Sequence, residues 1–150
     1  MDRGKIILLV DDSENDLLLM HMAFREAGST CLLHEVHNGE EAIAYLKGES
    51  PYDDRTRFPV PAVVLLDINM PMKNGFAVLK WARAQPALKR LSIIMLTASM
   101  RREDLEHAFD LGANSFLVKP TTLEELTKML RCLDEWLTYD QLPHNGAARK

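Results

Sequence analysis

The sequence predicts an α/β fold, a doubly wound sheet of five parallel strands flanked by five helices. Short apolar runs alternate along the chain with segments in which apolar residues recur at the helical period. Most of the apolar runs have few polar positions, which suits strands that helices cover on both faces. The expected strands are residues 5–10, 31–36, 62–66, 92–96 and 115–119, and the expected helices are residues 14–27, 39–47, 75–84, 101–111 and 122–138.

Individual elements are supported by local features. β-branched residues are densest in the first, third and fourth strands. Leu17, Met20 and Phe24 keep the helical period in the first helix, and Gly28 is expected to end it. Gly112 follows the fourth helix in the same role. The alternation implies right-handed crossovers between the strands.

Two further segments, the loop over residues 48–61 and the last helix, need their own interpretation. Residues 48–61, rich in proline and charge, interrupt the alternation. A tolerated surface insertion is the simpler explanation, and a contact with a partner is the alternative. The last helix carries leucines at spacings of three and four, as expected of a helix docked on a sheet. They are Leu123, Leu126, Leu130, Leu133 and Leu137.

Length and composition exclude several classes of protein. A chain of 150 residues is one domain by length and large enough for a core. Its net charge of -4 argues against general nucleic-acid binding. No apolar run approaches the roughly 20 residues that span a bilayer, and the start lacks a signal-peptide pattern. Cys31 and Cys132 lack metal-binding spacing, so reduced thiols and a cytoplasmic location are expected.

Polar side chains stand at the ends of four predicted strands. Asp11 and Asp12 follow the first strand, Asp67 the third, Thr97 ends the fourth, and Lys119 ends the fifth. In a parallel sheet the carboxyl ends of the strands converge on one edge, where open α/β folds place their ligand crevice. Three carboxylates, a hydroxyl and an ammonium are therefore expected to meet there.

Such a group of side chains suits phosphoryl transfer. Clustered carboxylates repel one another, and a hard divalent ion such as Mg²⁺ is the simplest positive partner. One aspartate can attack phosphorus and form an acyl phosphate, while the metal and the ammonium stabilise the transferring group. Taken singly, each residue has a structural alternative, since Asp after a strand often caps a helix and Lys-Pro often starts a turn. Their joint occurrence on successive strand ends favours function.

These residues resemble the motifs of receiver domains of bacterial two-component response regulators, over about residues 5–138. The segment Asp-Ile-Asn-Met-Pro-Met-Lys-Asn-Gly, which begins at Asp67, is similar to the family's D-x-x-M-P-x-x-x-G loop. The resemblance implies a flavodoxin-like fold of the receiver type and phosphorylation of Asp67. It also implies Mg²⁺, or Mn²⁺, held by Asp12, Asp67 and the backbone carbonyl of Asn69, with Asp11 assisting.

The same resemblance assigns roles to the other end of the site. Thr97 matches the switch hydroxyl, and Lys119 belongs to the family's Lys-Pro pair. Phe116 takes the place of an aromatic residue that moves with that hydroxyl, although a plain core residue is the alternative. Ser99 and Asn69 occupy positions that influence how fast the acyl phosphate hydrolyses.

A second apolar stripe in the last helix predicts self-association. Met129, Cys132 and Trp136 widen the apolar arc to about half of the helix circumference, and Trp136 is expected to anchor an interface. A broad core face is the alternative. The continuation over residues 135–143 resembles stand-alone response regulators that serve phytochrome-type sensor kinases, which implies a homodimer. The expected domain is residues 1–140, with residues 141–150 as a flexible tail or dimer arm.

The sequence therefore predicts a single-domain response regulator without an output domain. It would accept a phosphoryl group on Asp67 from a sensor histidine kinase, and it would not be an enzyme acting on other substrates. A non-phosphorylated dimeric adaptor is one alternative. An aspartate-nucleophile phosphohydrolase would need an acid where Asn69 stands, and a flavodoxin-like flavin binder would share the sheet topology. His34 and His37, with Glu35 between them, are a weaker candidate for a metal site.

Overall fold

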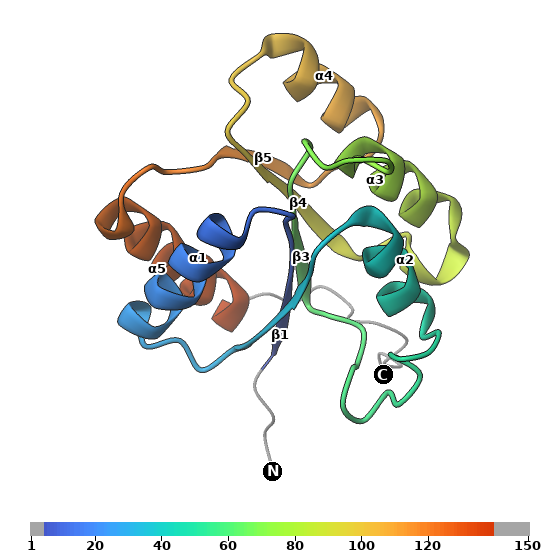
Figure 1. Cartoon of the computed structure of the whole chain (residues 1–150), viewed down its shortest axis with the longest axis horizontal. Helices are drawn as coiled ribbons and strands as arrows, with labels where there is room; N and C mark the ends of the chain where they lie inside the picture. The colour runs from blue at the N-terminus through green and yellow to red at the C-terminus, as the bar shows by residue number, and fades with distance from the viewer. Residues whose placement is uncertain (1–4, 140–150) are drawn as a thin grey trace.

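The computed structural model describes residues 5–139 as a five-stranded parallel sheet with helices on both faces (Figure 1). The strands lie in the order β2-β1-β3-β4-β5, which is a strand order of doubly wound sheets. They are β1 (Ile6–Val10), β2 (Leu32–Val36), β3 (Val63–Leu66), β4 (Ser92–Thr97) and β5 (Ser115–Val118). The helices are α1 (Glu14–Ala27), α2 (Gly39–Lys47), α3 (Gly75–Ala84), α4 (Arg102–Asp110) and α5 (Leu123–Tyr139), with a 3₁₀ turn at Pro86–Leu88.

The predicted fold class is confirmed, and the predicted bounds agree with the structure to within about one residue at most element ends. The expected tail, residues 141–150, and the first four residues of the expected domain lie outside the described residues. Within residues 5–139, no helix is both long enough and apolar enough to cross a membrane.

Alternate residues of the central strands build two hydrophobic clusters, one on each face of the sheet. Leu8 and Val10 of β1 pack into the cluster that α2, α3 and α4 cover. Ile7 and Leu9 pack into the cluster that α1 and α5 cover. Figure 1 shows α1 and α5 side by side on one face and α2 and α3 on the other. The side-chain alternation of a strand with period two therefore divides each buried strand between two cores.

The edge strands differ from the expectation of strands buried on both faces. β1, β3 and β4 are buried at every position, whereas β2 is exposed or half-buried until Val36 and β5 ends in the exposed Val118. β2 and β5 are the two ends of the strand order, so each has a neighbouring strand on one side alone. Their polar residues, His34 and Glu35 among them, follow from that edge position.

Side-chain caps and glycines set the helix ends. Ser13, Asn38 and Asn74 each accept a hydrogen bond from a backbone N–H in the first turn of α1, α2 and α3, respectively. Gly28 ends α1 in the left-handed region at φ 66°, as predicted.

Position 75 requires glycine because of a close contact with β3, and not because of the backbone conformation of a turn. Its backbone lies outside the left-handed region, so conformational freedom does not explain the glycine. A Cβ built on Gly75 would lie 2.2 Å from the carbonyl oxygen of Asp67. The N–H of Gly75 also donates to the carbonyl of Ile68 at 3.0 Å. The glycine therefore allows the start of α3 to pack directly against the end of β3.

The long loop over residues 48–61 packs on its own domain. The Arg55 guanidinium donates to the carbonyl oxygens of Tyr45, Leu46 and Phe58, each at 2.8 Å. The rings of Tyr52 and Phe58 lie against that of Tyr45, with centroids 5.1 and 5.9 Å away. The loop thus satisfies the last carbonyls of α2 and extends the aromatic part of the core.

Candidate functional site

The carboxyl ends of β1 and β3 bring three aspartates together. Each of Asp11, Asp12 and Asp67 offers a carboxylate oxygen, and these oxygens all lie within 4.8 Å of one another. Asp11 and Asp67 are 1% and 8% exposed, while Asp12 faces solvent. Oxygen ligands of this kind suit a hard divalent cation, so the donor set fits Mg²⁺ or Mn²⁺. We refer to these three residues as the acidic group.

The sheet itself holds the two buried aspartates in place. The Asp11 N–H donates to the carbonyl of Val36 at 3.2 Å, and the Asp67 N–H donates to the carbonyl of Val10 at 3.1 Å. Each aspartate therefore continues the hydrogen bonding of its strand by one residue. The convergence predicted from the strand ends follows directly from this register.

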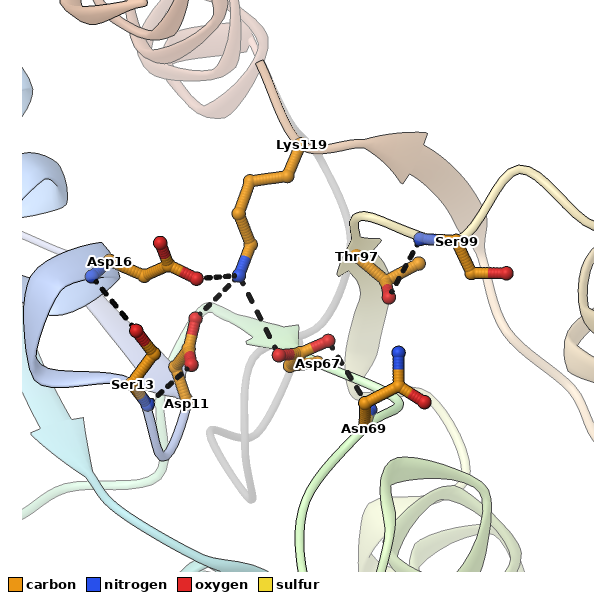
Figure 2. Close-up of polar contacts among 8 residues, drawn as sticks. All are labelled: Asp11, Ser13, Asp16, Asp67, Asn69, Thr97, Ser99 and Lys119. Carbon is orange, nitrogen blue, oxygen red and sulfur yellow. Dashed lines mark hydrogen bonds and ion pairs between the residues drawn. The ribbon is translucent and has the colours of Figure 1, made fainter. Parts of the chain in front are cut away.

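Lys119 brings the positive charge. Its ammonium donates to Asp11 Oδ2 and to Asp16 Oδ2, both at 2.7 Å, and lies 3.6 Å from Asp67 Oδ2 (Figure 2). Its backbone N–H donates to the carbonyl of Thr97 at 2.7 Å, which continues the pairing of β5 with β4. Both ends of the residue are therefore fixed, the backbone by the sheet and the side chain by carboxylates.

The pKa values of Lys119 and Asp11 are both raised, for different reasons. Burial acts to lower the pKa of Lys119, but hydrogen bonds to Asp11 and Asp16 and the charge of Asp67 outweigh it. For Asp11, burial is the larger effect and raises the pKa, although the hydrogen bond from Lys119 opposes it. The ammonium is thus shared among several carboxylates, and no single carboxylate is fully compensated. An additional cation is the physical complement of such a site.

Thr97 and Asn69 lie on the other side of Asp67 from Asp11 and Asp16 in Figure 2. Thr97 is fully buried, and its hydroxyl accepts a hydrogen bond from the Ser99 N–H at 3.3 Å. The Asn69 N–H donates to Asp67 Oδ1 at 3.4 Å. The Ser99 hydroxyl bonds to Asp104 Oδ2 at 2.5 Å, which connects this loop to the first turn of α4. The structure therefore gathers the predicted hydroxyl and asparagine around the same aspartate.

The remaining predicted residues lie away from the acidic group. Phe116 is half-buried and packs against the cluster under α2, α3 and α4. On α5, Met129 packs partly into its own core, so it belongs in part to the broad core face that was the alternative. Cys132 and Trp136 are exposed, Trp136 to 41%, and with Glu135 and Tyr139 they line a shallow hollow of about 360 Å³.

Sequence reasoning missed two groups of residues. Asp16 bonds to Lys119, but an acidic residue in the first turn of a helix is ordinarily explained by the helix dipole, so nothing marked it. Glu35 accepts from His21 at 2.5 Å and from His37 at 2.8 Å. The alternation of His34, Glu35 and His37 does not indicate the contact with α1, because His21 lies 14 residues away in sequence from Glu35. His34 instead bonds to the Tyr45 hydroxyl at 2.7 Å.

Comparisons with known proteins match the chain to one family. Residues 7–131 match the family described as the response regulator receiver domain. Response regulator Rcp1 of Synechocystis sp. is 33% identical over 140 residues, which is 93% of this chain and 93% of that protein. The chain spans nearly the whole length of this relative.

Solved structures give the same result. The Mn²⁺-bound form of Rcp1 superposes with a TM-score of 0.81 at 33% identity, covering 93% of this chain and 99% of that one. The phosphorylated cyanobacterial phytochrome response regulator RcpA gives 0.83 at 33% identity with the same coverage. Response regulator RPA3017, described in red light signaling of R. palustris, gives 0.88 at 30% identity, covering 94% of this chain and 99% of that one.

Proposed function

The chain belongs to the response regulator receiver family, and on that premise we propose that Asp67 is the residue that accepts the phosphoryl group. As a receiver domain it is a signalling protein of two-component systems, with a histidine kinase as its partner. The observation that carries the assignment is the position of Asp67, within the acidic group and 3.6 Å from the ammonium of Lys119. Asp11 is buried more deeply and hydrogen-bonded to Lys119 and Ser13, so its oxygens are less available for attack.

The reaction is an in-line displacement at phosphorus. A carboxylate oxygen of Asp67 forms the new O–P bond while the N–P bond of a phosphohistidine breaks, and the bonding pair leaves with the imidazole nitrogen. A Mg²⁺ ion held by Asp11, Asp12, Asp67 and the carbonyl of Asn69 would supply positive charge to the phosphoryl oxygens. Lys119 supplies a second charge from the end of β5, since its ammonium already lies beside Asp67.

Thr97 and Phe116 would change their positions when Asp67 is phosphorylated. The Thr97 hydroxyl lies at the end of β4, next to β3, and would donate to a phosphoryl oxygen on Asp67. The contact from Ser99 to Asp104 extends any shift of this loop into α4. Phe116, on the adjacent β5, is half-buried and would complete its burial when Thr97 moves. Phosphorylation acts only as far as it favours that second arrangement.

Intact-mass analysis tests the assignment. The wild-type protein is incubated with Mg²⁺ and acetyl phosphate beside Asp67→Asn, which is isosteric but cannot form an acyl phosphate. We expect one added phosphoryl group on the wild type and none on the variant. An equal adduct on both proteins would move the acceptor to another residue, and no adduct on either would favour the dimeric adaptor. Thermal unfolding of both proteins controls for loss of the fold.

The relatives support a proposal for the class of the partner kinase. RcpA is described as a phytochrome response regulator, and two further structures at 30% identity are described as bacteriophytochrome response regulators. The partner in our proposal is accordingly a phytochrome-type histidine kinase, and the location is the cytoplasm, where kinases draw on ATP. We expect a radiolabelled phosphoryl group to pass to Asp67 from a phytochrome-type histidine kinase. We expect no such transfer from a histidine kinase with a sensor domain of another type.

The proposed surface for self-association lies on α5. The exposed Cys132, Trp136 and Tyr139 on α5 are the surface through which two copies would associate. Turnover of external phosphate esters is not part of the proposal, because Asn69 stands two residues after Asp67, where an aspartate-nucleophile phosphohydrolase would need an acid.

A further inference from the structure

Lys119 has a second carboxylate partner that does not belong to the acidic group. Of its two short contacts, one reaches the buried Asp11 and the other reaches Asp16, each at 2.7 Å. The Asp16 side chain is 35% exposed, against 1% for Asp11 and 10% for Asp67. Figure 2 shows Asp16 on the far side of the Lys119 ammonium from Asp67. The ammonium thus lies between two buried carboxylates and one at the mouth of the site.

Asp16 is connected to the acidic group through the start of α1. The Ser13 N–H donates to Asp11 Oδ1 at 2.9 Å, and the Ser13 hydroxyl accepts from the Asp16 N–H at 3.2 Å. The same residues that begin the helix therefore fix the distance between Asp11 and Asp16. The Lys119 ammonium spans that fixed gap with two of its three donors.

This arrangement matters when a divalent cation joins the acidic group. Asp11 and Asp67 would then serve both the ion and the ammonium, and the two positive charges repel each other. Asp16 lies outside the set of three aspartates whose oxygens gather within 4.8 Å. Its carboxylate is therefore free of the ion and can keep the ammonium when the ion draws on Asp11.

We propose that Asp16 is a positioning residue for Lys119. It retains the ammonium at the mouth of the acidic group, so that the ammonium and a divalent ion occupy the site together. Without Asp16, the ammonium depends on Asp11 and Asp67 alone and competes with the ion for them. The inference rests on the proposed metal-dependent function and adds a residue that the receiver motifs of this sequence do not include.

A double-mutant cycle on Mg²⁺ affinity tests this role, with calorimetric titration of the unphosphorylated protein as the readout. We expect Asp16→Asn to weaken Mg²⁺ binding by about five-fold when Lys119 is present. In a Lys119→Gln background the same substitution should change the affinity by less than about two-fold, because no ammonium remains to be held. Asp16→Glu, which keeps the carboxylate, should restore at least part of the affinity.

Matched controls separate positioning from general charge. Glu14→Gln removes an exposed carboxylate from the same helical turn and should leave the Mg²⁺ affinity within about two-fold of the wild type. Equal losses from Asp16→Asn in both backgrounds would overturn the positioning role while leaving the metal site intact. A wild-type protein that takes up no Mg²⁺ would overturn both this inference and the metal requirement. Thermal unfolding of each variant confirms that the fold is retained.

Discussion

Thr97 is a polar residue in a fully buried place, and its neighbours indicate why. Its hydroxyl accepts from the Ser99 N–H, and the Ser99 hydroxyl continues to Asp104 on α4. A buried hydroxyl is tolerated when it is hydrogen-bonded. Here the same bonds form a short chain from the end of β4 to a helix that carries exposed apolar residues such as Phe109.

Removing the Thr97 hydroxyl should separate phosphorylation from its response. We expect Thr97→Ala to accept a phosphoryl group from acetyl phosphate on Asp67, because it takes away no carboxylate and no ammonium. The change in amide hydrogen exchange of α4 on phosphorylation should fall by at least about half. Ser92→Ala is the matched control, since Ser92 is equally buried but begins β4 at the opposite edge of the sheet. If the amide hydrogen exchange of α4 changes as much in Thr97→Ala as in the wild type, the Thr97 hydroxyl does not transmit the effect of phosphorylation.

His37 provides a pH-dependent contribution to stability. Its hydrogen bond to Glu35, together with the charge of Glu41, raises the pKa of His37 above 6.5. Burial acts to raise the pKa of Glu35, but hydrogen bonds from His21 and His37 outweigh it and lower the value below 4.5. A raised histidine pKa stabilises the fold below 6.5 and loses that effect as the pH rises through the folded value. A lowered glutamate pKa stabilises above 4.5 and loses the effect as the pH falls through the folded value. The stabilising effects of His37 and Glu35 are therefore both present between about pH 4.5 and pH 6.5.

His37→Gln should therefore destabilise the protein more at about pH 5.5 than at about pH 8.5. The expected loss is at most about 0.5 kcal/mol, because the ring is half exposed and the pair is screened by solvent. Urea unfolding at the two pH values measures the difference. His107→Gln serves as the control, since that ring packs against Phe76 rather than against Glu35. A loss that is independent of pH would assign the effect to packing.

At the scale of an element, the C-terminal end of α2 depends on a side chain from the following loop. A helix leaves its last carbonyls without helical partners, and Gly48 satisfies part of this need through its own N–H. Arg55 satisfies the carbonyls of Tyr45 and Leu46 and also holds Phe58 of its own loop. The planar guanidinium reaches all three oxygens at once through two nitrogens held in a rigid fork, whereas an ammonium is a compact point charge on a flexible stem.

Arg55→Met should lower the free energy of unfolding by about 1–3 kcal/mol, because it leaves three carbonyls without this donor while keeping much of the side-chain volume. Arg55→Lys should recover only part of the loss. Arg57→Met is the control, since Arg57 is exposed and lies over the Phe58 ring at 5.0 Å without a role in the helix end. The control should change stability by less than about 0.5 kcal/mol. Chemical denaturation gives the values, and equal losses in both variants would contradict the role of Arg55.

At the scale of the whole molecule, α5 presents two faces. Leu126, Leu130, Leu133 and Leu137 are buried against the sheet and α1. Trp136 and Tyr139 are 41% and 78% exposed, and they lie beside the exposed Cys132. A stable interface buries roughly 1,200–2,000 Å² in total, so these side chains would form its centre rather than its full extent.

Trp136→Ser should shift the protein from dimer to monomer, because large aromatic side chains dominate interface energies. Light scattering during size-exclusion chromatography measures the mass in solution. Leu18→Ser is the control, since Leu18 is 60% exposed on α1 and belongs to a different surface. Loss of dimer in the control alone would move the interface to α1. A wild-type protein that is monomeric, phosphorylated or not, would rule out self-association.

Much of the molecule could be predicted because strand burial and strand ends leave marks in the sequence. Asp11, Asp67 and Thr97 stand where apolar runs stop, so their convergence follows from parallel topology alone. Arg55 could not be predicted, because a side chain that bonds backbone carbonyls leaves no periodic pattern. The burial of β2 and β5 depends on strand order, which the runs do not specify. Gly75 was recognisable as a special position, but its cause, a close approach to Asp67, is a tertiary contact.

The loop of residues 48–61 enters β3 at its amino end, whereas the acidic group lies at the carboxyl ends of the strands, on the opposite edge of the sheet (Figure 1). This polarity offers an orientation for immobilisation. A chemical handle at Asp53 or Asp54, both exposed, would attach the protein to a sensor chip with the phosphorylation site turned towards the solution. If the handle is a cysteine introduced at Asp53, the exposed Cys132 would first be replaced by serine, so that attachment occurs at one point. The protein could then serve as uniformly oriented bait for the kinase.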